Sequence, residues 1–293
     1  MITIVLGAVM TTSASCSNSV NYDSNKVHHG KSSFKSKVDN TFFQWFKMWL
    51  KEGSYPSIEP KEIKSILAKT DHKQINSPAD IAQATWIGHA TVLVQYRGIN
   101  FLTDPHLTYY PSPLEWLAPK RSTPTALSSA KIIELDWWGS HQFSKEVKIT
   151  IVPNIHWSRR TPWDTNKSLW GSWAVEIGDS QSWFTGDTGY DRKLFKEIGQ
   201  KLGPFELAMI PIGAYGPRYF MLLQHLDPAQ AVLVHNEIGS QNSIAIHWGT
   251  FQLTHEPFLE PPELLVQAMR KNGIKNTQFR ALKVGETIEI ADN

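Results

Sequence analysis

Three residues that can bind a metal ion each follow a short apolar run of the sequence: His156, Asp187 and His247. The runs span residues 149–153, 182–185 and 243–246. Short apolar runs bounded by turn residues are typical of buried strands, so the three side chains are expected at one edge of a sheet. Two imidazoles and one carboxylate suit zinc or iron. A lone histidine of this kind is more often a partly buried side chain with one hydrogen bond, but the repeated placement at strand ends favours a metal site.

The turn that carries Asp187 is Thr185-Gly186-Asp187-Thr188-Gly189. Glycine tolerates backbone angles that other residues cannot adopt, so this turn can present a carboxylate at the end of a strand. The alternative is a plain turn in which the aspartate hydrogen-bonds to its own backbone. The histidines that follow the other two apolar runs favour the functional interpretation.

The composition predicts one large domain. The chain has 293 residues, 41% of them hydrophobic, which is enough to bury a full core. Its 29 basic and 27 acidic residues are spread along the chain and give a net charge of +2, so no nucleic-acid partner is expected. The single cysteine, Cys16, excludes an internal disulfide and a cysteine-based zinc site.

The first sixteen residues are similar to a bacterial lipoprotein signal. An apolar run is followed by small residues and then by Cys16, which would become the lipidated first residue of the mature protein. No Lys or Arg precedes the run, so a disordered start remains the alternative. We predict this signal at 1–16, a flexible tether at 17–40 and one folded domain at 41–293. An exported chain would be lipid-anchored through Cys16 at the bacterial cell envelope; otherwise we expect a cytoplasmic, membrane-associated protein.

Residues 42–50 are densely aromatic and have helical spacing. The residues that share one face of such a helix are Phe42, Trp45, Phe46 and Trp49. The simpler interpretation is a helix packed on the domain. The alternative is a surface for a membrane or for acyl chains, because Lys47 and Lys51 would flank the apolar face.

From residue 84 onward, the pattern predicts strands first and then strands that alternate with helices. Antiparallel strands at 91–96 and 99–105, the second ending at Asp104-Pro105, are joined by Arg97-Gly98, which is typical of a hairpin turn. Further strands are expected at 131–135, 147–152, 173–177, 182–185, 207–211 and 243–246, and helices at 192–201, 228–237 and 261–272. This order predicts a layered α/β fold with helices outside.

Several tryptophan-rich blocks carry a family resemblance, in order, between about residue 40 and residue 270. They are Thr85–Thr91, Leu102–Pro105, Pro119–Arg121, Glu134–Trp138, His156–Thr161, Leu169–Trp173, Thr185–Tyr190, Ile210–Tyr215, Gln224–Pro228 and Ile246–Phe251. Through these blocks the chain resembles the N-acyl-phosphatidylethanolamine-hydrolysing phospholipase D group of the metallo-β-lactamase fold. The resemblance implies that residues 41–293 form a hydrolase domain, an αββα sandwich with a two-zinc site at one edge of its inner sheets.

The resemblance also implies an activity and residue roles. Family members hydrolyse a phosphodiester lipid to N-acylethanolamine and phosphatidic acid with zinc as cofactor, so a phospholipid or another phosphodiester is the implied substrate and a membrane surface an implied partner. His156 and His247 match ligands of different zincs, and Asp187 matches the ligand that bridges them. His225 matches a histidine near the substrate phosphate, and Tyr215 lies in a loop of the same cleft. Asp187 and His225 are thus expected in catalysis, and Tyr215 and His225 in substrate binding.

The chain departs from the family at its defining motif, His-x-His-x-Asp-His. That motif should lie between Arg121 and Glu134, where the sequence offers only Ser122–Lys131. A strand-helix-strand portion is missing with it, together with four of the family's seven metal ligands. The predicted fold is therefore an internally truncated αββα sandwich that binds at most one zinc. The neighbours of the lost strand must either pair again locally or be destabilised.

Three functions from different classes remain open at this point. The first is a metal-dependent phosphodiesterase of the named family, impaired by the loss of the motif. The second is a catalytically silent, lipoprotein-like module that binds lipids. The third is a truncated family member with no function of its own. The absent motif opposes the first, and the intact remaining blocks oppose long drift under the second.

Overall fold

The fold is described from a computed structural model, in which residues 2–6, 23–38, 42–77, 81–105, 133–159 and 164–290 are placed. Cys16 and the segment Ser122–Lys131, where the metal motif was expected, lie outside the described residues.

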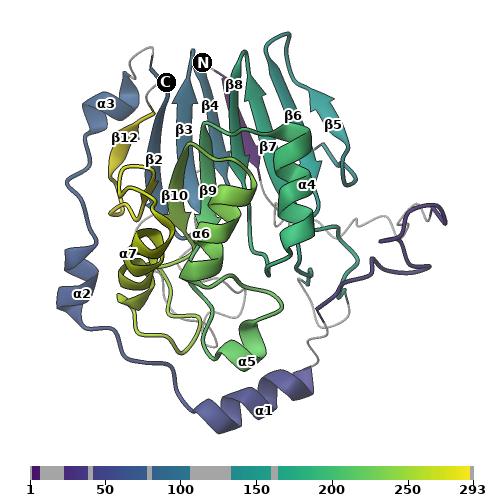
Figure 1. The fold of residues 1–293 in the computed structure, drawn as a ribbon, viewed down its shortest axis with the longest axis vertical. Coiled ribbons are helices and arrows are strands. Elements are labelled where there is room, and N and C mark those ends of the chain that lie inside the picture. The colour runs from purple at the N-terminus through teal and green to yellow at the C-terminus, as the bar shows by residue number, and fades with distance from the viewer. Residues whose placement is uncertain are drawn as a thin grey trace.

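Two sheets face each other in the core of the molecule (Figure 1). The first sheet has the order β1 (Ile2–Leu6), β4 (Ile99–Thr103), β3 (Thr91–Tyr96), β2 (Gln83–Gly88) and β12 (Thr287–Glu289). The second has the order β11 (Phe279–Arg280), β10 (Asn242–Ile246), β9 (Leu207–Pro211), β8 (Ser180–Phe184), β7 (Ser172–Ile177), β6 (Val147–Val152) and β5 (Ser140–Gln142). All five residues of β9 are buried, as expected for a strand in the middle of a sheet that is covered on both faces.

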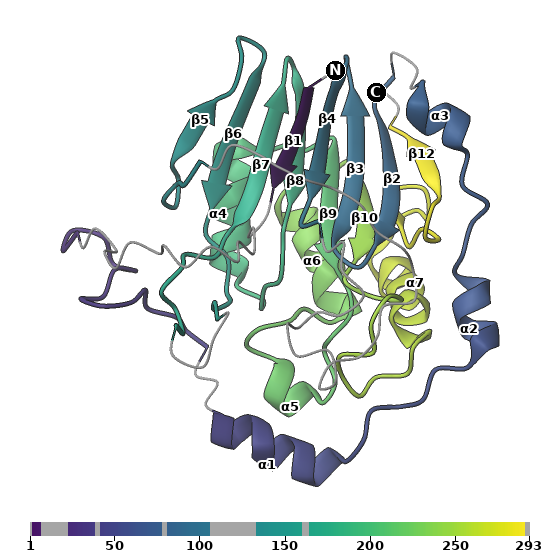
Figure 2. The same cartoon turned by 180° about the vertical axis from the view of Figure 1, so that it is seen from behind.

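Helices cover the outer face of the seven-stranded sheet (Figure 1). They are α4 (Arg192–Leu202), α6 (Pro228–Glu237) and α7 (Glu260–Asn272). The remaining helices are α1 (Phe42–Glu52), α2 (Pro60–Ser65), α3 (His72–Asn76) and α5 (Arg218–Met221). Figure 2 shows the five-stranded sheet from outside, and no helix of the described residues lies across it. The second outer helical layer of the expected αββα sandwich is thus not found in the described part of the chain.

Aromatic side chains join the layers. Trp86 of β2 stacks on Trp248, which follows β10, with ring centroids 5.1 Å apart, so this pair links the two sheets. Trp183 of β8 is fully buried and packs against Phe195 of α4 and against Phe205, with both centroid distances 6.0 Å. Buried aromatic rings contribute large apolar area, so these contacts fix the spacing of the layers.

The edge of β4 is occupied by the start of the chain. Ile2–Leu6 pairs in parallel with Ile99–Thr103, while β3 pairs with the other side of β4. A strand in this place satisfies backbone groups that a bare edge would leave unpaired. The strand that pairs with this edge consists of residues that lie within the predicted signal, and the predicted loss of a strand stays a prediction.

The short-range predictions agree with the structure except at one strand. The hairpin between β3 and β4 turns through Arg97 (φ 47°) and Gly98 (φ 72°), and the two positive angles are typical of a type I′ turn. The strand predicted at 131–135 is wrong in its described part, because 133–135 forms no strand. Ile133 is 37% exposed there, so its apolar character does not reflect burial in a sheet.

Helix α1 presents most of its apolar residues to solvent. Met48 is 3% exposed, but Phe43 and Leu50 are each 62% exposed. Trp45, Phe46 and Trp49 are 39–43% exposed. The simpler expectation was a helix packed on the domain, but Met48 is the buried apolar side chain among those described in α1. None of the helices in the placed ranges has the length and apolar character needed to cross a bilayer.

Part of the predicted tether lies against the domain. In residues 23–38, the Phe34 N–H donates to the Asn166 carbonyl (2.7 Å), and the Ser36 hydroxyl donates to the His156 carbonyl (2.6 Å). Lys37 also pairs with Asp191 at 2.8 Å. A flexible tether is thus not what the structure shows for 23–38, although the predicted domain boundaries stay a prediction.

Candidate metal centre

Strand direction explains why three distant residues meet. Strands β8, β9 and β10 are parallel to one another, and β6 runs in the same direction as β8 because both are antiparallel to β7. The chain therefore leaves β6, β8 and β10 at the same edge of the sheet. His156, Asp187 and His247 follow these strands and lie at that edge, as the sequence predicted.

A fourth residue, His225, joins them from the segment between α5 and α6. The Nε2 atom of His247 lies 3.0 Å from Oδ1 of Asp187. The His225 ring lies 5.4 Å from the His156 ring and 5.3 Å from the His247 ring, between centroids. Ligand atoms of His156, Asp187 and His225 all lie within 4.8 Å of one another, close enough to hold one metal ion.

The set that could bind an ion in this geometry differs by one residue from the predicted one. The resemblance implies His156, Asp187 and His247 as ligands, with His225 near the substrate. In the structure His225 groups with His156 and Asp187, while His247 hydrogen-bonds to Asp187. All four are neighbours, so the predicted convergence is correct and the division of roles stays a prediction.

The nitrogen atoms of this cluster fit a cation. His156 Nδ1 lies 2.9 Å from the Trp157 carbonyl, to which it can donate only if Nδ1 carries the proton. Its Nε2 is then a lone pair, and this buried atom has no hydrogen-bond partner among the described atoms. His225 Nδ1 and His247 Nδ1 are also buried without a partner there. Since buried polar atoms are normally hydrogen-bonded, an unpartnered lone pair on His156 close to the Asp187 carboxylate suits a cation.

Burial and charge act in opposite directions on the pKa values of the cluster. Burial by itself would raise the pKa of Asp187, but the charge and hydrogen bond of His247, together with His156 and His225, hold it well below its usual range. Burial would lower the pKa of His247, but Asp187 outweighs it and the pKa is raised. Burial lowers the pKa of His156, and it lowers the pKa of His225 well below its usual value. In both residues the negative charge of Asp187 acts in the opposite direction but is the smaller effect. His156 and His225 are therefore neutral near pH 7, the form that binds metals.

Asn154 holds the turn that carries Asp187 through two side-chain hydrogen bonds. This role was not predicted from the sequence. The Nδ2 atom of Asn154 donates to the Asp187 carbonyl at 2.9 Å and to the Thr185 carbonyl at 3.2 Å, and the residue is 4% exposed. The Ile155 N–H donates to Thr188 Oγ1 (3.0 Å), and the Gly189 N–H donates to the Ile155 carbonyl (2.8 Å). These bonds tie the two segments that carry His156 and Asp187.

Asp104 is a second acidic residue at the site that sequence reasoning missed as a functional candidate. Burial, the nearby charge of Asp187 and a smaller opposing effect of His247 raise its pKa to about 6. Its φ angle is 26°, an uncommon value for a residue other than glycine. The available signal was its position just after a strand, since Asp104 directly follows β4 and Asp187 follows β8 after two residues.

Behind the cluster, His89 lies against His247. Their ring centroids are 4.2 Å apart, and the His89 carbonyl accepts hydrogen bonds from the His247 N–H (2.9 Å) and from Trp86 Nε1 (3.0 Å). This position is consistent with a supporting role for His89.

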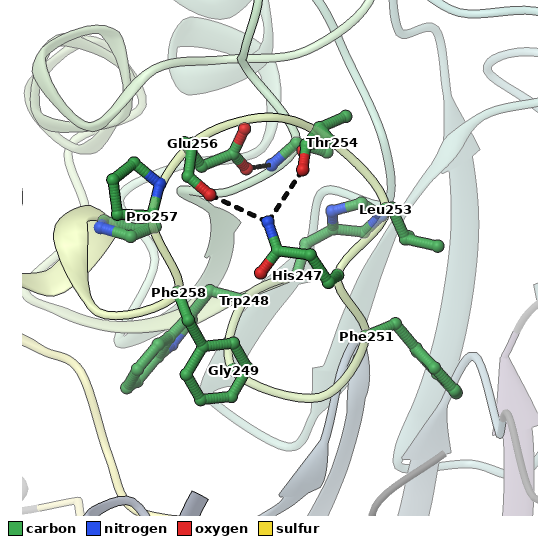
Figure 3. A pocket seen from close by; sticks show the side chains of 12 residues that line it. His247, Trp248, Gly249, Phe251, Leu253, Thr254, Glu256, Pro257 and Phe258 are labelled. Carbon is green, nitrogen blue, oxygen red and sulfur yellow. Dashed lines mark hydrogen bonds between the residues drawn. The ribbon is translucent and has the colours of Figure 1, made fainter. Parts of the chain in front are cut away.

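A pocket borders His247 on the side of the 248–258 segment (Figure 3). Glu256 accepts the Ala214 N–H at 2.6 Å and the Gly216 N–H at 2.8 Å, and so fixes the loop that carries Tyr215. The Tyr215 hydroxyl donates to Glu260 at 2.5 Å. Tyr215 is therefore near the pocket but directed to Glu260, and its role in substrate binding stays a prediction.

Residues 101–248, half of the chain, match the family model described as the beta-lactamase superfamily domain. The chain belongs to the metallo-β-lactamase superfamily. Within it, an N-acyl-phosphatidylethanolamine-hydrolyzing phospholipase D 1 from Caenorhabditis elegans is 36% identical over 270 residues, which cover 71% of this chain and 76% of the relative. A mitochondrial N-acyl-phosphatidylethanolamine-hydrolyzing phospholipase D from Saccharomyces cerevisiae is 34% identical over 195 residues, 63% of this chain and 42% of the relative. The family expected from the sequence blocks is confirmed.

Solved structures agree on the fold. A possible metal-dependent hydrolase from Veillonella parvula has a TM-score of 0.52 at 14% identity and covers 71% of this chain and 99% of its own. A metallo hydrolase from Ignicoccus hospitalis has a TM-score of 0.50 at 16% identity, with 72% and 99% covered. At such identities the likeness shows the fold alone. Membership of the metallo-β-lactamase superfamily implies a bound metal, often zinc, and the curated relatives support a metal-dependent hydrolase.

Proposed function

We propose that this chain is a metal-dependent phosphodiesterase that acts on N-acyl-phosphatidylethanolamine or a related phosphodiester lipid, with activity reduced by the missing motif. The observation that carries the proposal is the cluster of His156, Asp187, His225 and His247, with three buried nitrogens that have no partner among the described atoms. We infer that His156 and Asp187 hold one ion, with His225 or His247 as the third ligand.

When bound, a zinc ion would supply positive charge that activates water and polarises the phosphoryl group. The chain's own residues prepare the site for it. His156 keeps a neutral ring whose buried Nε2 has no partner among the described atoms, and Asp187 keeps its negative charge. Asp104, with a pKa of about 6, is a candidate to hold or release a proton at neutral pH.

The reduction in activity is inferred from the sequence. Four of the ligands that the resemblance implies are absent. The alignment with the C. elegans relative supports a deletion. It spans 270 residues but includes only 71% of the 293 residues of this chain, which is about 208 residues. The relative therefore has residues within the aligned span that this chain lacks.

A second candidate function is a catalytically silent module that binds lipids. The exposed aromatic residues of α1 favour it, since an apolar helix face flanked by Lys47 and Lys51 is suited to a membrane surface. Lipid anchoring through Cys16 at the cell envelope is part of the same proposal. Mass spectrometry of the protein from its host tests it, because a chain that begins at lipidated Cys16 would lack β1.

The function is tested by hydrolysis of N-acyl-phosphatidylethanolamine in mixed micelles, with added zinc. We expect slow release of N-acylethanolamine that disappears in His156→Ala and persists in His141→Ala, a control on edge strand β5. No hydrolysis at any zinc concentration, or hydrolysis unchanged by His156→Ala, would contradict the enzyme and favour the silent module.

A further inference from the structure

Residues 23–38 form no helix and lie at one side of the molecule, to the right in Figure 1 and to the left in Figure 2. We call this segment the strap. Its Ser36 hydroxyl donates to the main-chain carbonyl of His156, and the Val38 N–H donates back to the same hydroxyl oxygen at 2.9 Å. Its Lys37 pairs with Asp191, which lies four residues after Asp187. The strap thus contacts both segments that carry the candidate ligands.

The other end of the strap is held by one carboxylate. Asp136 lies 2.7 Å from His28 Nε2 and 3.2 Å from His29 Nε2, and it also pairs with Lys26. Burial would raise the pKa of Asp136, but the hydrogen bonds from Lys26 and His28, and one from the Trp137 N–H, hold it well below its usual range. Asp136 is therefore ionised at neutral pH and can bind all three side chains.

The surroundings of His28 and His29 make this a structural anchor. The His28 ring lies 4.2 Å from the Trp137 ring between centroids, and His29 is 6% exposed. The Trp137 indole N–H donates to the Trp170 carbonyl (2.5 Å), which connects the anchor to the segment after His156.

His28, His29 and Asp136 also have the residue types of a metal site, but their hydrogen bonds oppose one. The Asp23 N–H donates to His29 Nδ1 at 3.2 Å, so a neutral His29 carries its proton on Nε2, the atom that faces Asp136. A metal ligand would need a lone pair there. The Lys26 ammonium already supplies positive charge to the same carboxylate.

We propose that Ser36 is a positioning residue for His156 and that Asp136 anchors the strap which presents it. The proposal rests on the proposed metal centre for its functional meaning. Groups that orient a metal ligand typically change metal affinity by about 10–100-fold when they are removed. Since Ser36 acts on the backbone of His156, its loss should loosen that residue without removing it.

The primary test is amide hydrogen exchange of the metal-free, full-length chain. Ser36→Ala and Asp136→Ala should speed exchange in peptides that cover residues 155–166, where the Ile155 and Ser158 amides are hydrogen-bonded. Ser36→Thr keeps a hydroxyl and should restore protection. The matched control is Ser65→Ala, which removes a similar bond to the Glu62 carbonyl in α2 at 2.7 Å and should leave those peptides unchanged. Unchanged exchange in Ser36→Ala, or an equal effect of Ser65→Ala, would overturn the proposal.

The second readout is binding of Co²⁺ alone, followed by its visible absorption. We expect Ser36→Ala to weaken binding by about 10-fold, with rescue by Ser36→Thr. If the wild-type chain binds no Co²⁺ but the exchange effect persists, the strap stands and the proposed function fails. If Co²⁺ binds equally well to Ser36→Ala and wild type, the positioning role fails while the metal centre stands. Binding that survives Asp187→Asn but is lost in Asp136→Asn would make the anchor a metal site and overturn its assignment.

Discussion

Asn154→Leu is the substitution that most directly tests how the Asp187 turn is held. The change keeps a side chain of similar size but removes the two hydrogen bonds from Nδ2 to the Asp187 and Thr185 carbonyls. Each buried group left without its partner costs about 1–3 kcal/mol, and the apolar side chain recovers part of this by burial. We expect the free energy of unfolding to fall by about 2–4 kcal/mol, with an unchanged dependence on urea.

The same substitution should weaken zinc binding by about 10–100-fold, because the turn that presents the Asp187 carboxylate loses its support. The matched control is Asn242→Leu at the opposite end of β10, where Nδ2 makes one bond of 3.2 Å to the Glu206 carbonyl. It should cost about 1 kcal/mol and leave zinc affinity unchanged. Urea unfolding and competition with a chelating dye measure both quantities. An Asn154→Leu protein within about 0.5 kcal/mol of wild type, or with wild-type zinc affinity, would refute this reasoning.

Three further predictions concern other parts of the fold. Gly213→Ala would place a methyl group against the His247 carbonyl oxygen, so we expect the protein to lose more than about 2 kcal/mol of stability and to bind zinc more weakly. The control is Gly53→Ala, whose methyl group meets open space and which should cost about 1 kcal/mol. Burial lowers the pKa of His235 from 6.5 to about 4, so as the pH falls the histidine is protonated in the unfolded chain before it is protonated in the folded one. The free energy of unfolding is therefore unaffected by this group above about pH 6.5 and falls by at most about 3 kcal/mol as the pH is lowered towards 4. Urea titrations of a His235→Gln protein should show a flatter pH dependence over that range. Trp183→Ala should cost about 3–5 kcal/mol in thermal or urea unfolding, and a loss below about 1 kcal/mol would contradict the packing described for β8.

The strands and the strand-end residues were predictable from the sequence because their signals are local. The apolar run before His247 and the hairpin glycine at Gly98 each reflect neighbours within a few residues. Once the strands run in the same direction, the convergence of His156, Asp187 and His247 follows from topology alone. The family blocks added His225, which follows no strand and carries no periodic signal.

What the sequence did not predict depends on contacts between distant residues. The polar composition of 17–40 predicts a tether, but residues 26–29 meet Asp136, more than 100 positions away. The pairing of β1 with β4 joins residues that are 97 positions apart in the sequence. The raised pKa of Asp104 follows from burial beside Asp187, which no local pattern records.

The most direct test of the metal centre is elemental analysis of the purified full-length chain, alone, after chelator treatment, and as Asp187→Asn. We predict about one zinc per chain that chelator removes and that Asp187→Asn does not bind. Two tightly held zincs per chain would contradict the inferred effect of the missing motif. No bound metal in a chain that unfolds cooperatively would contradict the metal centre itself.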